Sequence, residues 1–143
     1  MAGDFVGRPR SERPRLAVLA TSYGPNSHAA CFCERLVCGM ELTDGWHDPR
    51  CEVTSLYLMQ EATDDVGLAF AAEHGIRMYP SVATALCEGG DELAVDGVVL
   101  IGEHGQFPWN DRRQRLYPRR ELFDQVVGVF RQSDRVVPLF IDK

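Results

Sequence analysis

Four short apolar runs, separated by segments of helical period, constrain the fold of this chain more than any other feature of its sequence. The runs are LAVLA from Leu16, CEVTSLYL from Cys51, VDGVVLIG from Val95 and RVVPLFI from Arg135. Because each run is apolar at successive positions, it is typical of a strand that is covered on both faces. A fifth, shorter strand is predicted over residues 76–80. Strands that alternate with helices in this way predict a parallel sheet with crossover helices.

Four helices are predicted between these strands. The first is expected to begin at Asn26 or Ser27, either of which is a good N-cap, and to run to about Met40. The others are predicted over residues 64–74, 81–86 and 120–132. The predicted inner face of the first helix comprises Ala29, Phe32, Cys33, Leu36, Val37 and Met40. In the second helix, Val66, Ala69, Phe70 and Glu73 have the spacing of one face of an amphipathic surface helix, and the last helix carries a broad apolar stripe of Leu122, Phe123, Val126, Val127 and Phe130.

The fold class predicted from this order is α/β, with a doubly wound parallel sheet of about five strands in a Rossmann-like, three-layer αβα arrangement. The 143 residues are enough for one domain with a real core. Residues 15–143 are assigned to that domain. Residues 1–14 are rich in Gly, Pro and charge without a hydrophobic period, and they are predicted to form a flexible leader.

Charge and composition exclude several classes of function. The chain has 15 basic and 21 acidic residues and a formal net charge of -6, which argues against binding nucleic acid or an anionic membrane through the overall field. No apolar run approaches the roughly 20 residues of a membrane span, and the N-terminus lacks the apolar core of a signal peptide. Five cysteines without a CxxC pair favour reduced thiols. A cytoplasmic location is therefore predicted.

The loop after the first strand is a candidate binding site, because ligands of doubly wound sheets bind beyond the carboxyl ends of the strands. Its polar groups lie at a helix N-terminus, where free N–H groups favour an anion or a nucleotide. The alternative is that Asn26 or Ser27 only caps the helix and Tyr23 packs over the sheet edge. His28 is a candidate catalytic residue. The predicted cofactor-binding residues are Thr21, Ser22, Tyr23, Asn26 and Ser27.

A second candidate site follows the fourth strand, where Glu103 and His104 lie between two glycines. A neutral imidazole can act as a general base and a nearby carboxylate can orient it, so His104 is the first choice for a catalytic acid or base. The alternative is that both side chains satisfy loop amides. The long loop that follows is predicted either to clamp an acidic or planar substrate or to be solvated. Its predicted substrate-binding residues are Trp109, Asn110, Tyr117 and Arg119.

The series His28, Cys31, Cys33 and Cys38 could suggest a metal site, but helical geometry argues against one. On a helix, Cys31 and Cys38 are about 10.5 Å apart, which is too far for both thiolates to bind one zinc ion. No metal is therefore predicted. Cys31 lies in the first helical turn, where a reactive thiol is an alternative to a plain surface thiol.

Several motifs resemble the nucleotide-binding half of the glucose-fructose oxidoreductase, inositol dehydrogenase and MocA (Gfo/Idh/MocA) family. Residues 71–105 resemble that family's helix ending in HG, its short strand and its VDaVvI strand. The strings SLYLMQ, GGDELAVDGVVLIGEHG, LYPRRELF and VPLFIDK are similar to those of uncharacterised relatives of the family. The resemblance covers residues 15–143.

This resemblance implies an oxidoreductase that uses NAD or NADP, with Lys143 as a proton donor. The first loop, however, has one glycine where a dinucleotide-binding turn has G-x-G-x-x-G. The sequence also ends before the family's substrate domain, so a homodimer or a partner subunit is expected to replace that domain. Two functions are predicted: a small-molecule enzyme that transfers a hydride or a proton, or a non-catalytic module that binds a nucleotide or sugar phosphate.

Overall fold

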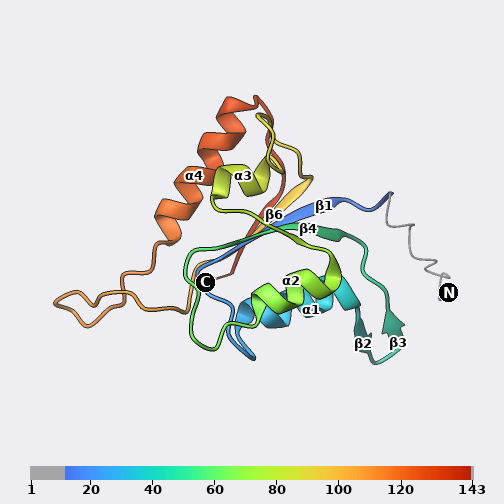
Figure 1. The fold of residues 1–143 in the computed structure, drawn as a ribbon, viewed down its shortest axis with the longest axis horizontal. Helices are drawn as coiled ribbons and strands as arrows, with labels where there is room; N and C mark the ends of the chain where they lie inside the picture. The colour runs from blue at the N-terminus through green and yellow to red at the C-terminus, as the bar shows by residue number, and fades with distance from the viewer. Residues whose placement is uncertain (1–11, 143) are drawn as a thin grey trace.

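The sheet of this protein has five parallel strands in the order β5-β4-β1-β6-β7 (Figure 1). The structure is a computed structural model that describes residues 12–142, so Lys143 and most of the predicted leader lie outside the described residues. The strands are β1 (Arg15–Ala20), β4 (Glu52–Leu58), β5 (Arg77–Met78), β6 (Gly97–Ile101) and β7 (Leu139–Asp142). The predicted doubly wound α/β fold is confirmed.

Helices cover both faces of the sheet. In Figure 1, α1 (His28–Cys38) and α2 (Gly67–His74) lie below it, and α3 (Val82–Leu86) and α4 (Arg119–Gln132) lie above it. In β1, Ala17 and Leu19 belong to the core shared with α3 and α4, whereas Val18 and Ala20 belong to the core shared with α1 and α2. All four are fully buried. Successive side chains point to opposite faces, which explains why this strand is continuously apolar.

An antiparallel hairpin of β2 (Met40–Leu42) and β3 (Gly45–His47) was not predicted from the sequence. The first helix ends at Cys38, because Gly39 adopts a φ of 94° and turns the chain toward the hairpin. The backbone approaches closely there, since a Cβ on Gly39 would lie 2.5 Å from the carbonyl oxygen of His47. Met40, predicted on the inner face of the helix, is in fact an exposed residue of β2.

The inner face of α2 also differs from the prediction. The helix begins at Gly67, three residues late, because the Asp65 carboxylate accepts hydrogen bonds from the amides of Gly67 and Leu68. Its buried residues are Gly67 and Ala71, whereas Ala69, on the predicted amphipathic face, is exposed. Tertiary packing decides this orientation, because the ring of Tyr23 occupies the space above Gly67.

The two apolar segments near the end of the chain are less buried than predicted. In α4, Leu122, Val126 and Phe130 are buried as predicted, whereas Phe123 is 38% exposed. The prediction that the last run is covered on both faces is wrong, because Phe140 and Ile141 of β7 are exposed by 51% and 45%. Among the described residues, β7 pairs with β6 alone and is an edge strand.

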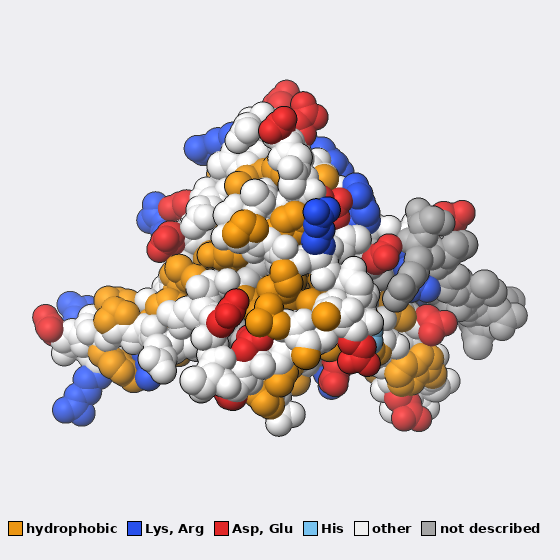
Figure 2. Space-filling model, viewed as in Figure 1, with side chains coloured by type: hydrophobic (Ala, Val, Ile, Leu, Met, Phe, Trp, Pro, Cys, Tyr) orange, Lys and Arg blue, Asp and Glu red, His pale blue; other side chains and the backbone are white. Residues whose placement is uncertain are grey.

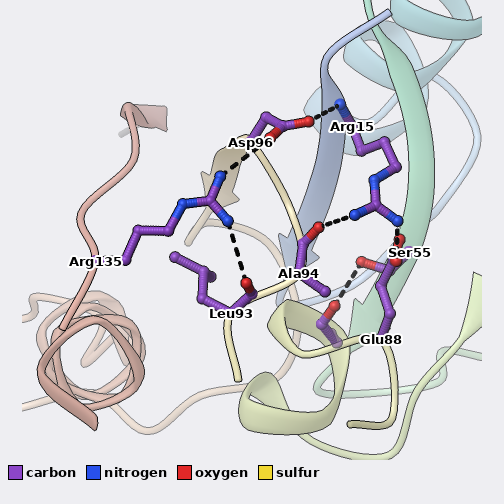
Figure 3. Close-up of polar contacts among 8 residues, drawn as sticks. Arg15, Ser55, Glu88, Leu93, Ala94, Asp96 and Arg135 are labelled. Atoms are coloured by element: carbon purple, nitrogen blue, oxygen red, sulfur yellow. Dashed lines mark hydrogen bonds and ion pairs between the residues drawn. The ribbon is translucent and has the colours of Figure 1, made fainter. Parts of the chain in front are cut away.

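A polar network joins the amino ends of β1 and β6 (Figure 3). The guanidinium of Arg15 donates hydrogen bonds to the carboxylate of Glu88, at 2.7 Å, and to the carbonyl oxygen of Ala94. The carboxylate of Asp96 accepts hydrogen bonds from the backbone amide of Arg15, at 2.9 Å, and from Arg135, at 3.1 Å. These contacts stabilise the end of the sheet opposite to the loops discussed below.

Two segments project from the body of the molecule at opposite ends (Figure 1). One is the β2–β3 hairpin, and the other is the segment of residues 106–117, called the arm here. Figure 2 shows basic side chains at the tip of the arm, where Arg112 and Arg113 are exposed. No helix in the described part of the chain has the length and apolar character needed to cross a membrane.

Candidate active site

The carboxyl ends of β1, β6 and β7 bring three polar side chains together. The chain leaves β1 through α1 on one face of the sheet and leaves β6 through α4 on the other face. The neighbours β1 and β6 therefore flank the topological switch point, where ligands of such sheets bind. His28, His104 and Asp142 lie at these strand ends.

His28 and Asp142 form the shortest polar contact of this group. Nδ1 of His28 lies 2.5 Å from Oδ2 of Asp142, and the side chains are 36% and 16% exposed. In a neutral imidazole whose Nδ1–H donates to the carboxylate, Nε2 carries no proton. This is the tautomer that a general base requires.

Packing between α1 and β7 positions this pair. Phe32 lies four residues after His28 on α1, and Phe140 lies two residues before Asp142 on β7. These spacings place Phe32 on the same side of α1 as His28, and Phe140 on the same side of β7 as Asp142. The rings of Phe32 and Phe140 are in contact, with centroids 5.4 Å apart. The aromatic contact therefore holds His28 beside Asp142.

His104 faces the same pair from the loop after β6. Its ring centroid lies 5.3 Å from that of His28, and the rings meet edge to face at 62°. The residue has a φ of 74°, which is unfavourable for a residue with a side chain. Such strained conformations are frequent at functional sites. The structure thus brings together the two histidines that were predicted as candidate catalytic residues.

The loop that carries His104 is held by two neighbouring strand ends. The hydroxyl of Thr21, after β1, donates a hydrogen bond of 2.6 Å to the carbonyl oxygen of Glu103. The side-chain amide of Gln60, after β4, donates to the carbonyl oxygen of Gln106 at 3.0 Å, and its oxygen accepts from the Gln106 amide at 2.8 Å. These bonds stabilise the strained conformation of His104.

Glu103 and Arg119 form the outer side of this loop. Oε1 of Glu103 lies 3.8 Å from Nη1 of Arg119, the first residue of α4. Gly102 allows this approach, because a Cβ there would lie 2.4 Å from Cγ of Arg119. Arg119, predicted to bind substrate, is thus placed beside the predicted catalytic loop.

The residues predicted to bind a cofactor are largely used by the fold itself. Thr21, Ser22 and Tyr23 are buried, and Thr21 holds the loop described above. The hydroxyl of Ser27 accepts a hydrogen bond from the amide of Ala30 at 3.2 Å, so Ser27 is the N-cap of α1. Asn26 is exposed at a φ of 57°. The predicted capping is confirmed, and binding by these residues stays a prediction.

The other predicted substrate-binding residues, Trp109, Asn110 and Tyr117, belong to the arm. The side chain of Asn110 accepts hydrogen bonds from the amides of Arg112 and Gln114 and thereby forms the turn of the arm. Trp109 is 60% exposed and stacks with Arg115, whose guanidinium carbon lies 4.8 Å from the ring centroid. Tyr117 lines an open groove of about 990 Å³ between the arm and α4.

Asp142 and Gln60 were not assigned a role in the site from the sequence. Asp142 ends the fifth strand, and a carboxylate at the carboxyl end of a strand is a signal that could have identified it. The double hydrogen bond from Gln60 joins residues 46 positions apart, and no local pattern indicates it.

No metal-binding cluster of three or more His, Cys, Asp or Glu side chains occurs within residues 12–142. In α1, Cys33 is buried in the core and Cys38 is exposed. Cys31, the candidate reactive thiol, is half-buried.

The turn after β1 does not fit the pyrophosphate of NAD or NADP. A Cβ on Gly24 would make only ordinary contact, at 3.4 Å, with the carboxylate of Asp64, so this glycine does not create a close backbone approach. The carboxylates of Asp64 and Asp142 also flank the turn, where they would repel phosphate oxygens. Gln60 follows β4, where dinucleotide-binding domains of this type hold the ribose with an acidic residue, but its side chain already binds the loop of His104.

The buried thiol of Cys33 makes stability depend on pH. Burial raises the pKa of Cys33 from 9.0 to about 11, although the neighbouring Tyr23 hydroxyl lowers this pKa. The unfolded thiol loses its proton near pH 9, so the free energy of unfolding should fall as the pH rises from about 9 to about 11, by at most about 3 kcal/mol.

Urea denaturation at about pH 8 and about pH 10.5 measures this decrease. Cys33→Val should make the decrease smaller, whereas Cys38→Ser, which changes an exposed thiol of the same helix, should not alter it. An equal decrease in the wild type and in Cys33→Val would contradict the assignment.

Comparison with protein-family models, with curated proteins and with solved structures finds no significant match to this chain.

Proposed function

We propose that this protein is an enzyme that catalyses proton transfer on a small polar metabolite, with His28 as general base. The observation that carries the proposal is the 2.5 Å contact between Nδ1 of His28 and Asp142, with the ring of His104 across from it. A carboxylate that orients an imidazole, beside a second imidazole, is an arrangement suited to acid–base catalysis.

The substrate class that suits two imidazoles is a small α-hydroxy carbonyl compound. Nε2 of His28 takes the proton from the carbon next to the carbonyl group, and the C–H electron pair forms the new C=C bond. The carbonyl electron pair moves to oxygen, which takes a proton from a protonated His104. His28 then gives its proton to the former carbonyl carbon, and the hydroxyl group on the neighbouring carbon gives its proton to His104 and becomes the new carbonyl group. This completes an isomerisation and returns both histidines to their initial protonation states.

Asp142 is a positioning residue in this scheme. Its carboxylate keeps the proton of His28 on Nδ1 and stabilises the imidazolium that forms when Nε2 takes a proton. The sequence alone favours His104 for the acid–base role. His28 is nevertheless proposed as the base, because its imidazole is paired with the carboxylate of Asp142.

Solvent-deuterium exchange tests this function. The full chain is incubated in D2O with a panel of small α-hydroxy aldehydes and ketones, and loss of the C–H signal is followed by proton NMR. We expect exchange to be faster with the wild type than with His28→Ala for at least one compound. Equal rates for both proteins across the panel would overturn the proposal.

Hydride transfer with NAD or NADP, which the family resemblance implies, stays a separate prediction. Calorimetric titration of the full chain with each dinucleotide distinguishes it from proton transfer. Because Asp64 and Asp142 flank the turn after β1, we expect no saturable binding with a Kd below about 1 mM. Saturable binding would favour the oxidoreductase function.

A cytoplasmic location stays a prediction, and so does self-association through the edge of the sheet. Val136, Phe140 and Ile141 are exposed apolar residues at or beside β7, the edge strand. A partner that covered them would bury apolar area and pair the outer edge of β7.

A further inference from the structure

The two edges of the five-stranded sheet are protected to different degrees. β5, at one edge, has two residues, and one of them is the exposed Arg77. Short edge strands and charged side chains prevent pairing with another chain. β7, at the other edge, has four residues, of which Phe140 and Ile141 are exposed by 51% and 45%. The one charged residue of β7 is Asp142, which is paired with His28. β7 is therefore the edge that is open to a further strand.

The backbone of β7 also leaves hydrogen-bonding groups on this edge. The carbonyl oxygen of Pro138 accepts a hydrogen bond of 2.9 Å from the amide of Val98 in β6. Because the backbone groups of successive residues in a strand point to opposite edges, those of Phe140 also face β6, and those of Leu139 and Ile141 point outward. The N–H group that proline lacks would face β6, so Pro138 does not protect the outer edge. These outward groups have no strand partner within residues 12–142.

A second copy of this strand fits the edge by antiparallel pairing about a twofold axis at Phe140. In that register, Leu139 of each copy lies opposite Ile141 of the other, and their outward N–H and C=O groups form hydrogen bonds. Phe140 lies opposite Phe140 of the second copy in a non-hydrogen-bonded pair, where side chains approach most closely. Since Phe140 packs against Phe32, the aromatic pairs of the two copies meet on this face of the sheet.

We propose that this protein forms a twofold-symmetric dimer through antiparallel pairing of β7, which joins the two sheets into one. The pairing satisfies the outward backbone groups and removes the exposed apolar side chains of β7 from water. The interface adjoins the histidine site, because Asp142 lies in β7, opposite Pro138 of the second copy. The dimer does not depend on the proposed proton transfer, and its test uses no substrate.

Sedimentation equilibrium of the full chain tests the dimer. We expect a reversible dimer with a Kd of about 1 to 100 μM, because two four-residue strands form a small interface. Phe140→Lys places like charges directly opposite each other and should raise the Kd at least about tenfold. Leu42→Lys, which changes an apolar residue of β2 that is 50% exposed, should leave the Kd unchanged. A monomer at every concentration up to about 1 mM would overturn the inference, and so would an equal effect of the two substitutions.

Cysteine cross-linking tests the register of the pairing. Phe140→Cys brings two thiols together at a Cα separation of about 4.5 to 5.5 Å, which a disulfide can span. In Ile141→Cys, each new thiol lies opposite Leu139, and the two Cα atoms are more than about 7 Å apart. After mild oxidation, non-reducing electrophoresis should show a covalent dimer for Phe140→Cys above the level of the wild type, whose Cys38 is exposed. Equal cross-linking of Phe140→Cys and Ile141→Cys would overturn the proposed register.

Discussion

Replacing His28 with alanine is expected to lower the rate of solvent-deuterium exchange by a factor of about 10² to 10⁴. The substitution removes the imidazole that Asp142 orients, and no second histidine of this site forms an ion pair with a carboxylate among residues 12–142. Proton NMR of a compound that the wild type exchanges measures the rate. His104→Ala should lower it by a smaller factor, because the proposed role of His104 is to protonate the oxygen.

Asp142→Asn separates positioning from catalysis. An asparagine amide can donate to Nδ1 and thereby place the ring proton on Nε2, which is the wrong tautomer for a base. We expect the rate to fall at least about tenfold. The pH profile of the rate should also shift, which a purely structural role of Asp142 would not cause.

The other two histidines of the chain provide matched controls. His47 pairs with Asp44 in the β2–β3 hairpin, and His74 ends α2 against the ring of Phe70. His47→Ala and His74→Ala should therefore keep the exchange rate of the wild type. A decrease equal to that of His28→Ala in either control would contradict the assignment of the base.

The largest expected effect on stability is that of Gly67→Ala. A Cβ on Gly67 would lie 2.7 Å from Cγ and 2.9 Å from Cβ of Tyr23, which is fully enclosed by the core. Gly67 and Tyr23 cannot move apart without disturbing the packing of α2, so we expect the free energy of unfolding to fall by about 1 to 3 kcal/mol. Urea denaturation followed by circular dichroism measures it.

Gly128→Ala is the matched control within α4. No atom lies within 4 Å of a Cβ at this position, and alanine favours the helix more than glycine does. The free energy of unfolding should therefore rise, by up to about 1 kcal/mol. Similar decreases for both substitutions would show that the contact with Tyr23 does not determine the effect of Gly67→Ala.

Local patterns predicted most of the secondary structure correctly. The continuous apolar run of β1 arises because alternate side chains enter the two cores, and Ser27 caps the start of α1 as predicted. The β2–β3 hairpin was missed because its strands have three residues each, too few for a visible period. The orientation of α2 was wrong because the Tyr23 ring, from a distant segment, selects the face that carries Gly67.

Local sequence patterns predicted the five strands of the sheet, its four helices and the loops at its carboxyl edge, because these depend on periodicity and on capping residues a few positions apart. The same patterns selected His28 and His104 as candidate residues. The pairing of Asp142 with His28, across 114 positions, follows from the tertiary structure. That contact depends on the strand order, which places β7 beside β6, and on the packing of Phe32 against Phe140. Both are long-range interactions, and the local pattern of residues does not encode them.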